Sequence, residues 1–113
     1  MNTTLTLDKK SALKRLMNNE NLYDKLVILF SEQVEDIRRT LQNYRDMDTD
    51  SLRFALHTLK GSAGEIGAEA LRVELARVET IVKMTPDSIS DKDIHAVEHE
   101  ISLLMGELAL HYR

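Results

Sequence analysis

Apolar residues recur at three- and four-residue steps along most of this 113-residue chain, and this spacing predicts helices. The run over 20–44 places on one helical face Leu22, Leu26, Leu29, Phe30, Val34, Ile37, Leu41 and Tyr44. Three later runs also place their apolar residues on one helical face. The first has Leu52, Ala55, Leu56, Leu59, Ala63 and Ile66. The second has Leu71, Leu75, Val78 and Val82, and the third has Ile94, Val97, Ile101, Leu104 and Leu108. Each run is an amphipathic helix whose apolar stripe needs other elements to bury it.

Two polar segments and one glycine separate these runs. Residues 45–51 (RDMDTDS) form the first break, and residues 85–91 (TPDSISD) hold the only proline. The first break offers candidate N-caps for the next helix, namely Thr49, Asp50 and Ser51. Its acidic residues lack the ligand spacing of a calcium loop, so they too are assigned to helix capping. Gly67 is a candidate stop or kink between the second and third of the four runs.

The lengths of these segments indicate how the helices are arranged. Leu7–Met17 predicts a short helix that covers one end of the fold. Four amphipathic helices with short connections favour a bundle, and the breaks between them argue against a long coiled coil. Aromatic residues are only 4%, so the core is aliphatic, with Met84 and Met105 as filler. We therefore expect an all-α, antiparallel up-and-down four-helix bundle with a short extra N-terminal helix, forming one domain over 1–113.

Charge and composition exclude several classes of function. The formal net charge of -4 and the lack of a basic patch argue against binding to nucleic acid or to an anionic membrane. There is no cysteine, so the sequence predicts neither a disulfide framework nor a thiolate metal site. No apolar run approaches the roughly 18 residues of a membrane span. We expect a cytoplasmic protein or the soluble part of a larger one.

The string HTLKGSAGEIGA, from His57 to Ala68, departs from an ordinary amphipathic helix. At about 100° per residue, His57 lies about 140° from Leu52 and so faces away from the core. Gly61 and Gly64 follow at i+4 and i+7, on the same side as the histidine. Each glycine inside a helix costs roughly 0.5–1 kcal/mol relative to alanine. The string therefore predicts an exposed imidazole beside bare backbone.

Two interpretations of these glycines remain open on the helical wheel alone. They could let another molecule approach the ring closely, or they could let a neighbouring helix pack tightly. Lys60, one turn after His57, favours the first interpretation, because an ammonium beside the ring would attract a dianionic phosphoryl group. Ser62 lies on the other flank of the ring.

The string HTLKGSAGEIGAEAL, followed by VET at 78–80, resembles the histidine-containing phosphotransfer (HPt) domain of bacterial multistep phosphorelays. The family pattern His-x-Leu-Lys-Gly-Ser-Ala, then Ile-Gly-Ala, is matched residue for residue. The resemblance covers most of the chain, because the helices before and after the motif also follow in family order. It implies a helical bundle that carries a phosphoryl group and has no kinase or nucleotide site of its own.

The resemblance also implies a role for each motif residue. His57 would accept a phosphoryl group from a receiver domain of a hybrid sensor kinase and pass it to the aspartate of a response regulator. Lys60 would stabilise the phosphoryl charge, and Glu79, on the following helix, would hydrogen-bond the imidazole. Gly61 would give the receiver room, on a docking surface that also includes Gly64 and Ser62.

The resemblance implies no cofactor on this chain, because Mg²⁺ would belong to the receiver domain. It implies a monomer, either free-standing or as the soluble C-terminal domain of a membrane-bound sensor kinase. If Glu79 accepts the Nδ1 proton, the Nε2 lone pair faces outward, which is the tautomer that a nucleophilic imidazole needs.

Phe54 lies about 60° from His57 on the wheel and has two interpretations. An exposed phenylalanine would extend the receiver docking surface. Alternatively, Phe54 packs beneath the N-terminal helix, which is the favoured interpretation at this point. Arg53 and Arg72 are expected to be solvated at the rim.

Three rival functions are compatible with parts of the sequence. His95 and His99, with Glu98 beside them, have metal-ligand spacing but no convincing third ligand, so no metal site is predicted. A histidine-kinase dimerisation module would need an ATP-binding domain for which the chain has no room. A phosphate-independent receiver-docking module remains the alternative, although the intact set of His57, Lys60 and Gly61 argues against it.

Overall fold

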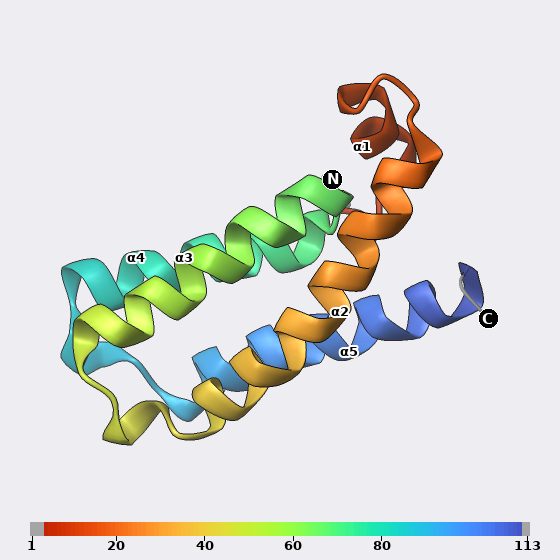
Figure 1. Cartoon of the computed structure of the whole chain (residues 1–113). Helices are drawn as coiled ribbons and strands as arrows, with labels where there is room; N and C mark the ends of the chain where they lie inside the picture. Colours follow the sequence, from red (N-terminus) through yellow and green to blue (C-terminus); the bar gives the residue numbers. More distant parts are fainter. Residues whose placement is uncertain (1–3, 112–113) are drawn as a thin grey trace.

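The computed structural model describes residues 4–111, and all of the regular structure there is helical (Figure 1). The five α-helices are α1 (Lys9–Arg15), α2 (Glu20–Gln42), α3 (Thr49–Ile66), α4 (Glu69–Met84) and α5 (Asp91–His111). Short 3-10 turns at Tyr44–Asp46 and Pro86–Ser88 occupy the two predicted breaks. The predicted all-α class and the short extra N-terminal helix are confirmed.

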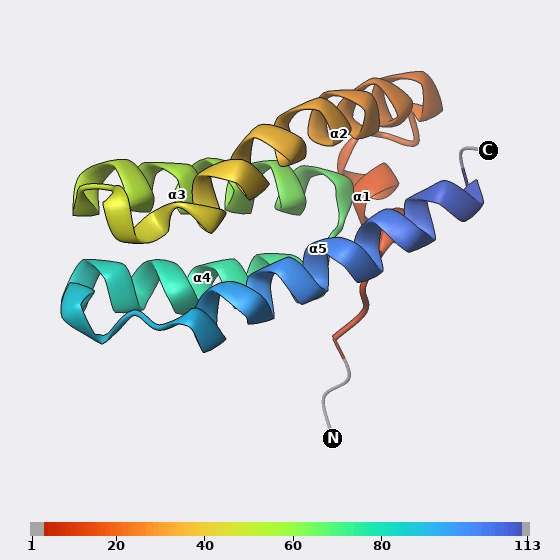
Figure 2. The same cartoon turned by 90° about the horizontal axis from the view of Figure 1, so that it is seen from below.

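The four long helices form two layers, with α2 beside α3 and α5 beside α4 (Figure 2). Gly67 and Ala68 alone connect α3 to α4, so these two helices run side by side in opposite directions. Contacts between α2 and α5 link the two layers on the other side. This arrangement is consistent with the predicted bundle. No helix in residues 4–111 is long and apolar enough to cross a membrane.

The core consists of the apolar stripes that the periodicity predicts, except for half-buried Ala55 on α3 and three leucines on α2. Leu22 and Leu29 were expected in the core but are 40% and 59% exposed, and Leu26 is only half-buried. They lie on the α3 side of the stripe, which is wider than the surface that the other helices cover. Met84 was also expected as core filler, but it ends α4 and is 70% exposed, since no helix extends over that position. Met105 does pack against the core.

The ends of α3 are fixed by one side chain and one glycine. Asp48 is the N-cap, where its Oδ1 accepts a hydrogen bond from the Ser51 backbone N at 2.8 Å. The candidate N-caps Thr49, Asp50 and Ser51 were therefore wrong by one to three residues, although the acidic stretch does cap the helix. At the other end Gly67 has a φ of 81°, the left-handed conformation that stops a helix. The predicted stop at Gly67 is confirmed.

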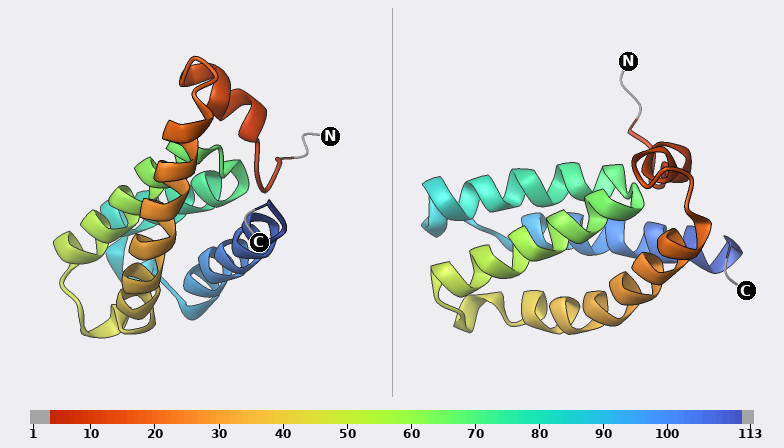
Figure 3. Two further views of the ribbon diagram at one scale, coloured as in Figure 1. Left: turned by 45° about the vertical axis from the view of Figure 1, so that its right-hand side comes forward. Right: turned by 45° about the horizontal axis from the view of Figure 1, so that its top comes forward.

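The N-terminal segment covers the end of the bundle where α3 turns into α4 (Figure 3). The Asp8 backbone N donates to the Gly67 carbonyl at 2.7 Å, and the Ala70 N donates to the Leu5 carbonyl at 2.9 Å. The Arg15 guanidinium donates to the Gly64 carbonyl at 2.7 Å, at the helix end that favours a cation. This segment thus adds hydrogen bonds to backbone groups at the end of α3 and the start of α4.

Candidate functional site

His57 lies in the middle of α3, and 68% of its side chain is exposed. Its neighbours Leu56 and Leu59 are fully buried, so the register of the helix alone turns the imidazole outward. Rigid helix on both sides of the residue fixes where the ring begins, which suits a group that another molecule must reach.

The imidazole is held from α4 by Glu79. The Nδ1 atom of His57 lies 3.1 Å from one carboxylate oxygen of Glu79 and 3.2 Å from the other. The Nζ atom of Lys60 lies 3.1 Å from the same carboxylate, on Oε1. Only 16% of the Glu79 side chain is exposed, so a nearly buried carboxylate joins the histidine and the lysine.

The charge of Glu79 decides how the ring is protonated. Burial works to raise the pKa of this carboxyl, but the hydrogen bonds from His57 and Lys60 outweigh it and hold the pKa below its ordinary value. An ionised carboxylate only accepts hydrogen bonds, so Nδ1 of His57 must carry the proton. In the neutral ring this leaves Nε2 with a free lone pair.

The two surface glycines of α3 meet different surroundings. A Cβ atom added at Gly61 would have nothing within 4 Å, which leaves space on the His57 side of the helix open. A Cβ at Gly64 would meet the Cδ atom of Arg72 on α4 at 3.4 Å, an ordinary packing contact. The space over Gly61 is therefore open to an approaching molecule, whereas Gly64 packs against α4.

Ser62 lies toward α2, whereas Phe54 is exposed on the outer surface of α3. The Ser62 hydroxyl donates to the Gln33 Oε1 atom on α2 at 2.6 Å, away from the His57 ring. Phe54 is 72% exposed. The interpretation that it packs beneath the N-terminal helix is wrong, because the N-terminal segment lies at the opposite end of α3, at Gly64 and Gly67.

A recess of about 400 Å³ opens beside the imidazole, between α3 and α4. His57, Glu79 and Phe54 line it together with Asp50, Arg53 and Lys83. Neither Asp50 nor Lys83 was predicted from the sequence to lie at the site. The helical spacing could have indicated Lys83, since it follows Glu79 by one turn on α4. The contact between Lys60 and Glu79 was also not anticipated.

The other histidines form no comparable cluster. His95 and His99 are both exposed on α5. Within residues 4–111, no group of three histidine, cysteine or acidic side chains is placed to hold a metal ion. Arg72 is half-buried and pairs with Glu69, whereas Arg53 is exposed in the recess.

Comparison with known families identifies the family of the chain. The family model described as Hpt domain matches residues 25–107, well over half of the chain. No curated protein and no solved structure matches the chain. The matched range includes the His57 helix and the Glu79 helix. The chain belongs to the Hpt domain family, whose members take part in histidine phosphotransfer in two-component signalling.

Proposed function

We propose that this chain is a phosphorelay intermediate in which His57 is the phosphorylated residue. One observation carries the proposal: Nδ1 is bound by nearly buried Glu79, while the ring as a whole is exposed. This arrangement supports His57 as a nucleophile that reacts through Nε2. The donor is the aspartyl phosphate of a hybrid sensor kinase receiver domain, and the acceptor is the aspartate of a response regulator.

The chemical step asks little of this chain beyond position and charge. The P–O bond of the aspartyl phosphate breaks, an Nε2–P bond forms, and the aspartate leaves as a carboxylate. No proton has to leave Nε2, because the single ring proton is on Nδ1 and stays hydrogen-bonded to Glu79. The positive charge that the ring gains lies against that carboxylate. Phosphoryl transfer depends mainly on such positioning and on charge stabilisation.

We assign to Lys60 the stabilisation of the phosphoryl oxygens. Its ammonium already lies beside the imidazole, held by Glu79, and its side chain is 28% exposed. An ammonium with three donors can keep one hydrogen bond to Glu79 while another turns to the phosphoryl group. Glu79 is then a positioning residue for both the ring and the lysine.

The remaining parts of the proposal concern the molecule as a whole. It acts as one domain, an antiparallel four-helix bundle, and as a monomer in the cytoplasm. Gly61 leaves room for the receiver, and Phe54, Gly64 and Ser62 lie on the docking surface. Mg²⁺ binds to the receiver and this chain holds no cofactor, because the transfer requires from it only a nucleophile and a cation. The chain carries a phosphoryl group without being a kinase.

The test is transfer from a panel of ³²P-labelled receiver domains to the wild type and to His57→Gln. His95→Gln is the matched control, since it removes an exposed histidine from another helix. We expect label on the wild type and on the control, lost in acid and stable in alkali, and none on His57→Gln. A folded wild type that no receiver labels would contradict the proposal and leave the phosphate-independent docking module.

A further inference from the structure

The recess beside His57 is lined by two cations that the fold leaves without an acidic partner. Arg53 on α3 and Lys83 on α4 both line it, and both are exposed. Within residues 4–111, neither side chain forms an ion pair. The charge of these two residues is therefore available to an anionic group in the recess.

The antiparallel course of α3 and α4 brings these two cations to the same level of the recess. Arg53 lies one turn before His57 on α3. Lys83 lies one turn after Glu79 on α4, and Glu79 contacts the His57 ring. Because the helices run in opposite directions, both steps lead the same way along the recess, by about 6 Å each. Both cations therefore lie on the same side of the imidazole.

The acidic residues nearby leave these cations uncompensated. Glu79 precedes Lys83 by four residues, a spacing that allows an ion pair on a helix. Its carboxylate instead accepts hydrogen bonds from His57 and Lys60, at 3.1 Å each. Asp50 also lines the recess, but it lies about 10 Å along α3 from the level of His57. Beside the imidazole two like charges therefore face each other, and an anion between them would relieve their repulsion.

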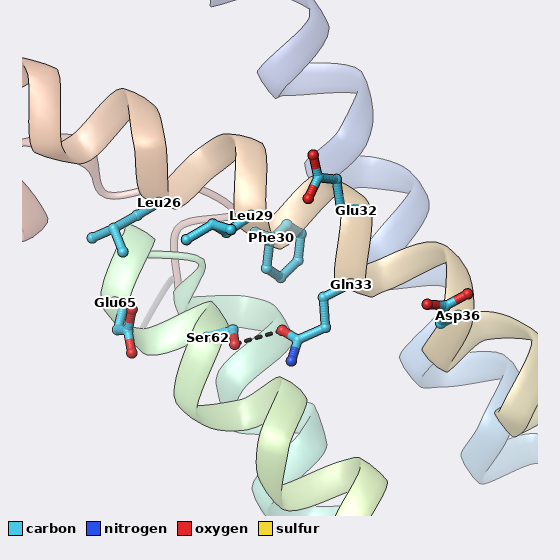
Figure 4. Close-up of a pocket in the computed structure, with 8 residues that line it drawn as sticks. All are labelled: Leu26, Leu29, Phe30, Glu32, Gln33, Asp36, Ser62 and Glu65. Carbon is cyan, nitrogen blue, oxygen red and sulfur yellow. Dashed lines mark hydrogen bonds between the residues drawn. The ribbon is translucent and has the colours of Figure 1, made fainter.

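The hollow on the other side of α3 has the opposite charge. A groove of about 510 Å³ between α2 and α3 is lined by three carboxylates (Figure 4). They belong to Glu32, Asp36 and Glu65, and no lysine or arginine from residues 4–111 lines the groove with them. Carboxylates repel a phosphoryl dianion, so of these two hollows beside α3 only the recess toward α4 suits a phosphoryl group.

We propose that Arg53 and Lys83 bind the phosphoryl group after its transfer to His57 and thereby shift the transfer equilibrium toward this chain. The inference rests on the proposed function, since it concerns the product of that transfer. The P–O bond to the receiver aspartate breaks and the Nε2–P bond forms, and only then is the phosphoryl group attached beside the recess. Guanidinium and ammonium hydrogen bonds to its oxygens therefore stabilise the phosphorylated form of this chain, without stabilising the phosphorylated receiver.

This role differs from that of Lys60. The Lys60 ammonium lies on the Glu79 carboxylate and does not line the recess, so its charge is already shared with an anion. A phosphoryl dianion on His57 has that same carboxylate on the other side of the ring. Two further cations offset the repulsion between the dianion and Glu79, which Lys60 alone cannot do.

The experiment measures how label distributes between this chain and the receiver domain that labels the wild type fastest. The main variant combines Arg53→Gln with Lys83→Gln. The matched control combines Lys10→Gln on α1 with Lys92→Gln on α5, which removes the same charge from exposed positions outside the recess. A third variant, Arg53→Lys combined with Lys83→Arg, exchanges the two side chains and keeps both charges.

We expect the glutamine double variant to shift the equilibrium distribution toward the receiver by about tenfold, or roughly threefold for each cation lost. The control pair leaves the distribution unchanged, and the charge-conserving variant recovers most of the shift. High salt reduces the difference between the double variant and the wild type, because the two cations are exposed.

A second readout observes the phosphoryl group without any receiver. The wild type and the variants are phosphorylated with phosphoramidate, a small donor, and the phosphohistidine is titrated by ³¹P NMR. The second ionisation of a phosphate monoester has a pKa near 6, and adjacent cations lower such a pKa because they favour the dianion. The phosphoryl pKa should therefore be higher in the glutamine double variant than in the wild type, by about 0.5.

Two results would overturn the inference and leave the proposed function intact. In the first, the glutamine double variant keeps the wild-type distribution and phosphoryl pKa, even if the receiver labels it more slowly. The two cations would then contact the receiver rather than the phosphoryl group. In the second, the control pair shifts both quantities as far as the double variant does, so that net charge acts and the recess does not. Failure of the proposed function looks different, because then no receiver labels the wild type at all.

Discussion

Two glycines of the motif, Gly61 and Gly67, have opposite roles in α3. At Gly61 an added Cβ would meet nothing within 4 Å, and the backbone is ordinary helix. At Gly67 an added Cβ would lie 2.3 Å from the Asp8 carbonyl oxygen, and the φ of 81° is already unfavourable for other residues. Gly61 is thus not required by the fold of this chain, whereas Gly67 is.

This difference separates the function of α3 from its folding. The exposed part around His57 contains residues that destabilise a helix slightly and leave its surface open. The end at Gly67 is fully buried and receives hydrogen bonds from a segment nearly sixty residues earlier in the chain. The position of the imidazole depends on the end of α3 at Gly67. The hydrogen bonds there fix α3 against α4, and α4 carries Glu79. Variants in each of the two regions test this difference.

Gly67→Ala should be the most damaging single change. A left-handed conformation costs an alanine roughly 1–2 kcal/mol, and relieving the overlap with Asp8 requires the N-terminal segment to shift. We expect the free energy of unfolding in urea to fall by about 3 kcal/mol. Gly106→Ala, at an open position in α5, is the control and should not destabilise the fold. A loss below about 1 kcal/mol would show that the segment does not hold this end.

Tyr23→Phe tests the same end with a smaller effect. The Tyr23 hydroxyl donates to the Ile66 carbonyl at 2.8 Å in a fully buried position, and its loss leaves that carbonyl unpaired. We expect a loss of about 1–2 kcal/mol in the free energy of unfolding. Tyr44→Phe is the control and should lose less, because its acceptor Asp91 also receives a hydrogen bond from Arg45 at 2.9 Å.

The pH dependence of this difference has a definite sign. Burial is the largest cause that raises the pKa of Tyr23 to about 12, with the charges of Asp24 and Glu20 adding to it. A raised folded-state pKa stabilises the protein below the ordinary value of 10.0 and stops doing so as the pH rises through 12. The stability difference between the wild type and Tyr23→Phe should therefore shrink above pH 10. A difference that stays constant there would contradict the buried donor.

The sequence was sufficient for features that are local in the chain. The helices follow from periodicity, and His57 with Gly61 and Gly64 shares one helical face, so the wheel alone predicts its outward direction. Gly67 was predicted as a stop because a left-handed glycine at a helix end is a local property. Glu79 followed only from the resemblance, since no local rule relates it to a histidine on another helix.

Features that depend on tertiary packing were missed or misjudged. Four consecutive polar residues could have capped α3, and only the path of the incoming chain selects Asp48. The exposure of Leu22 and Leu29 depends on how much of α2 is covered by α3. The periodicity of α2 alone does not predict this coverage. The hydrogen bonds from Asp8 and Arg15 to the end of α3 join residues 59 and 49 positions apart. No sequence pattern indicates which backbone groups such distant residues reach.

Glu79→Gln tests the contact by which α4 holds the imidazole of His57 and the ammonium of Lys60. A glutamine can still accept the Nδ1 proton of His57, but it loses the charge that holds Lys60. We expect a loss of roughly 1 kcal/mol in the free energy of unfolding at neutral pH. A lowered folded-state pKa stabilises the protein above the ordinary value of 4.5 and stops doing so as the pH falls through the lowered value.

The free energies of unfolding of the wild type and of Glu79→Gln should therefore converge as the pH falls below 4.5. Urea titrations of the wild type and Glu79→Gln across this range measure the difference directly. If the difference persists unchanged into strong acid, the charge of Glu79 is not what stabilises the cluster. The shape of the glutamate would then matter more than its ionisation.

Gly61→Ala has the smallest effect on stability and the opposite sign. Because the added Cβ meets open space inside a helix, we expect the free energy of unfolding to rise by about 0.5–1 kcal/mol. Under the proposed function, the same methyl group stands where the receiver approaches His57, so transfer from the receiver slows. Labelling by phosphoramidate should stay unchanged, because a small donor needs no room over this turn.

Gly106→Ala provides the matched control, since its Cβ also meets nothing within 4 Å and it lies on α5. It should give the same gain in stability with no change in transfer. If Gly61→Ala gained stability and transferred at the wild-type rate, the glycine would serve neither the fold nor the partner. A gain in stability together with slower transfer would show that the open turn at Gly61 serves the partner at the expense of the helix.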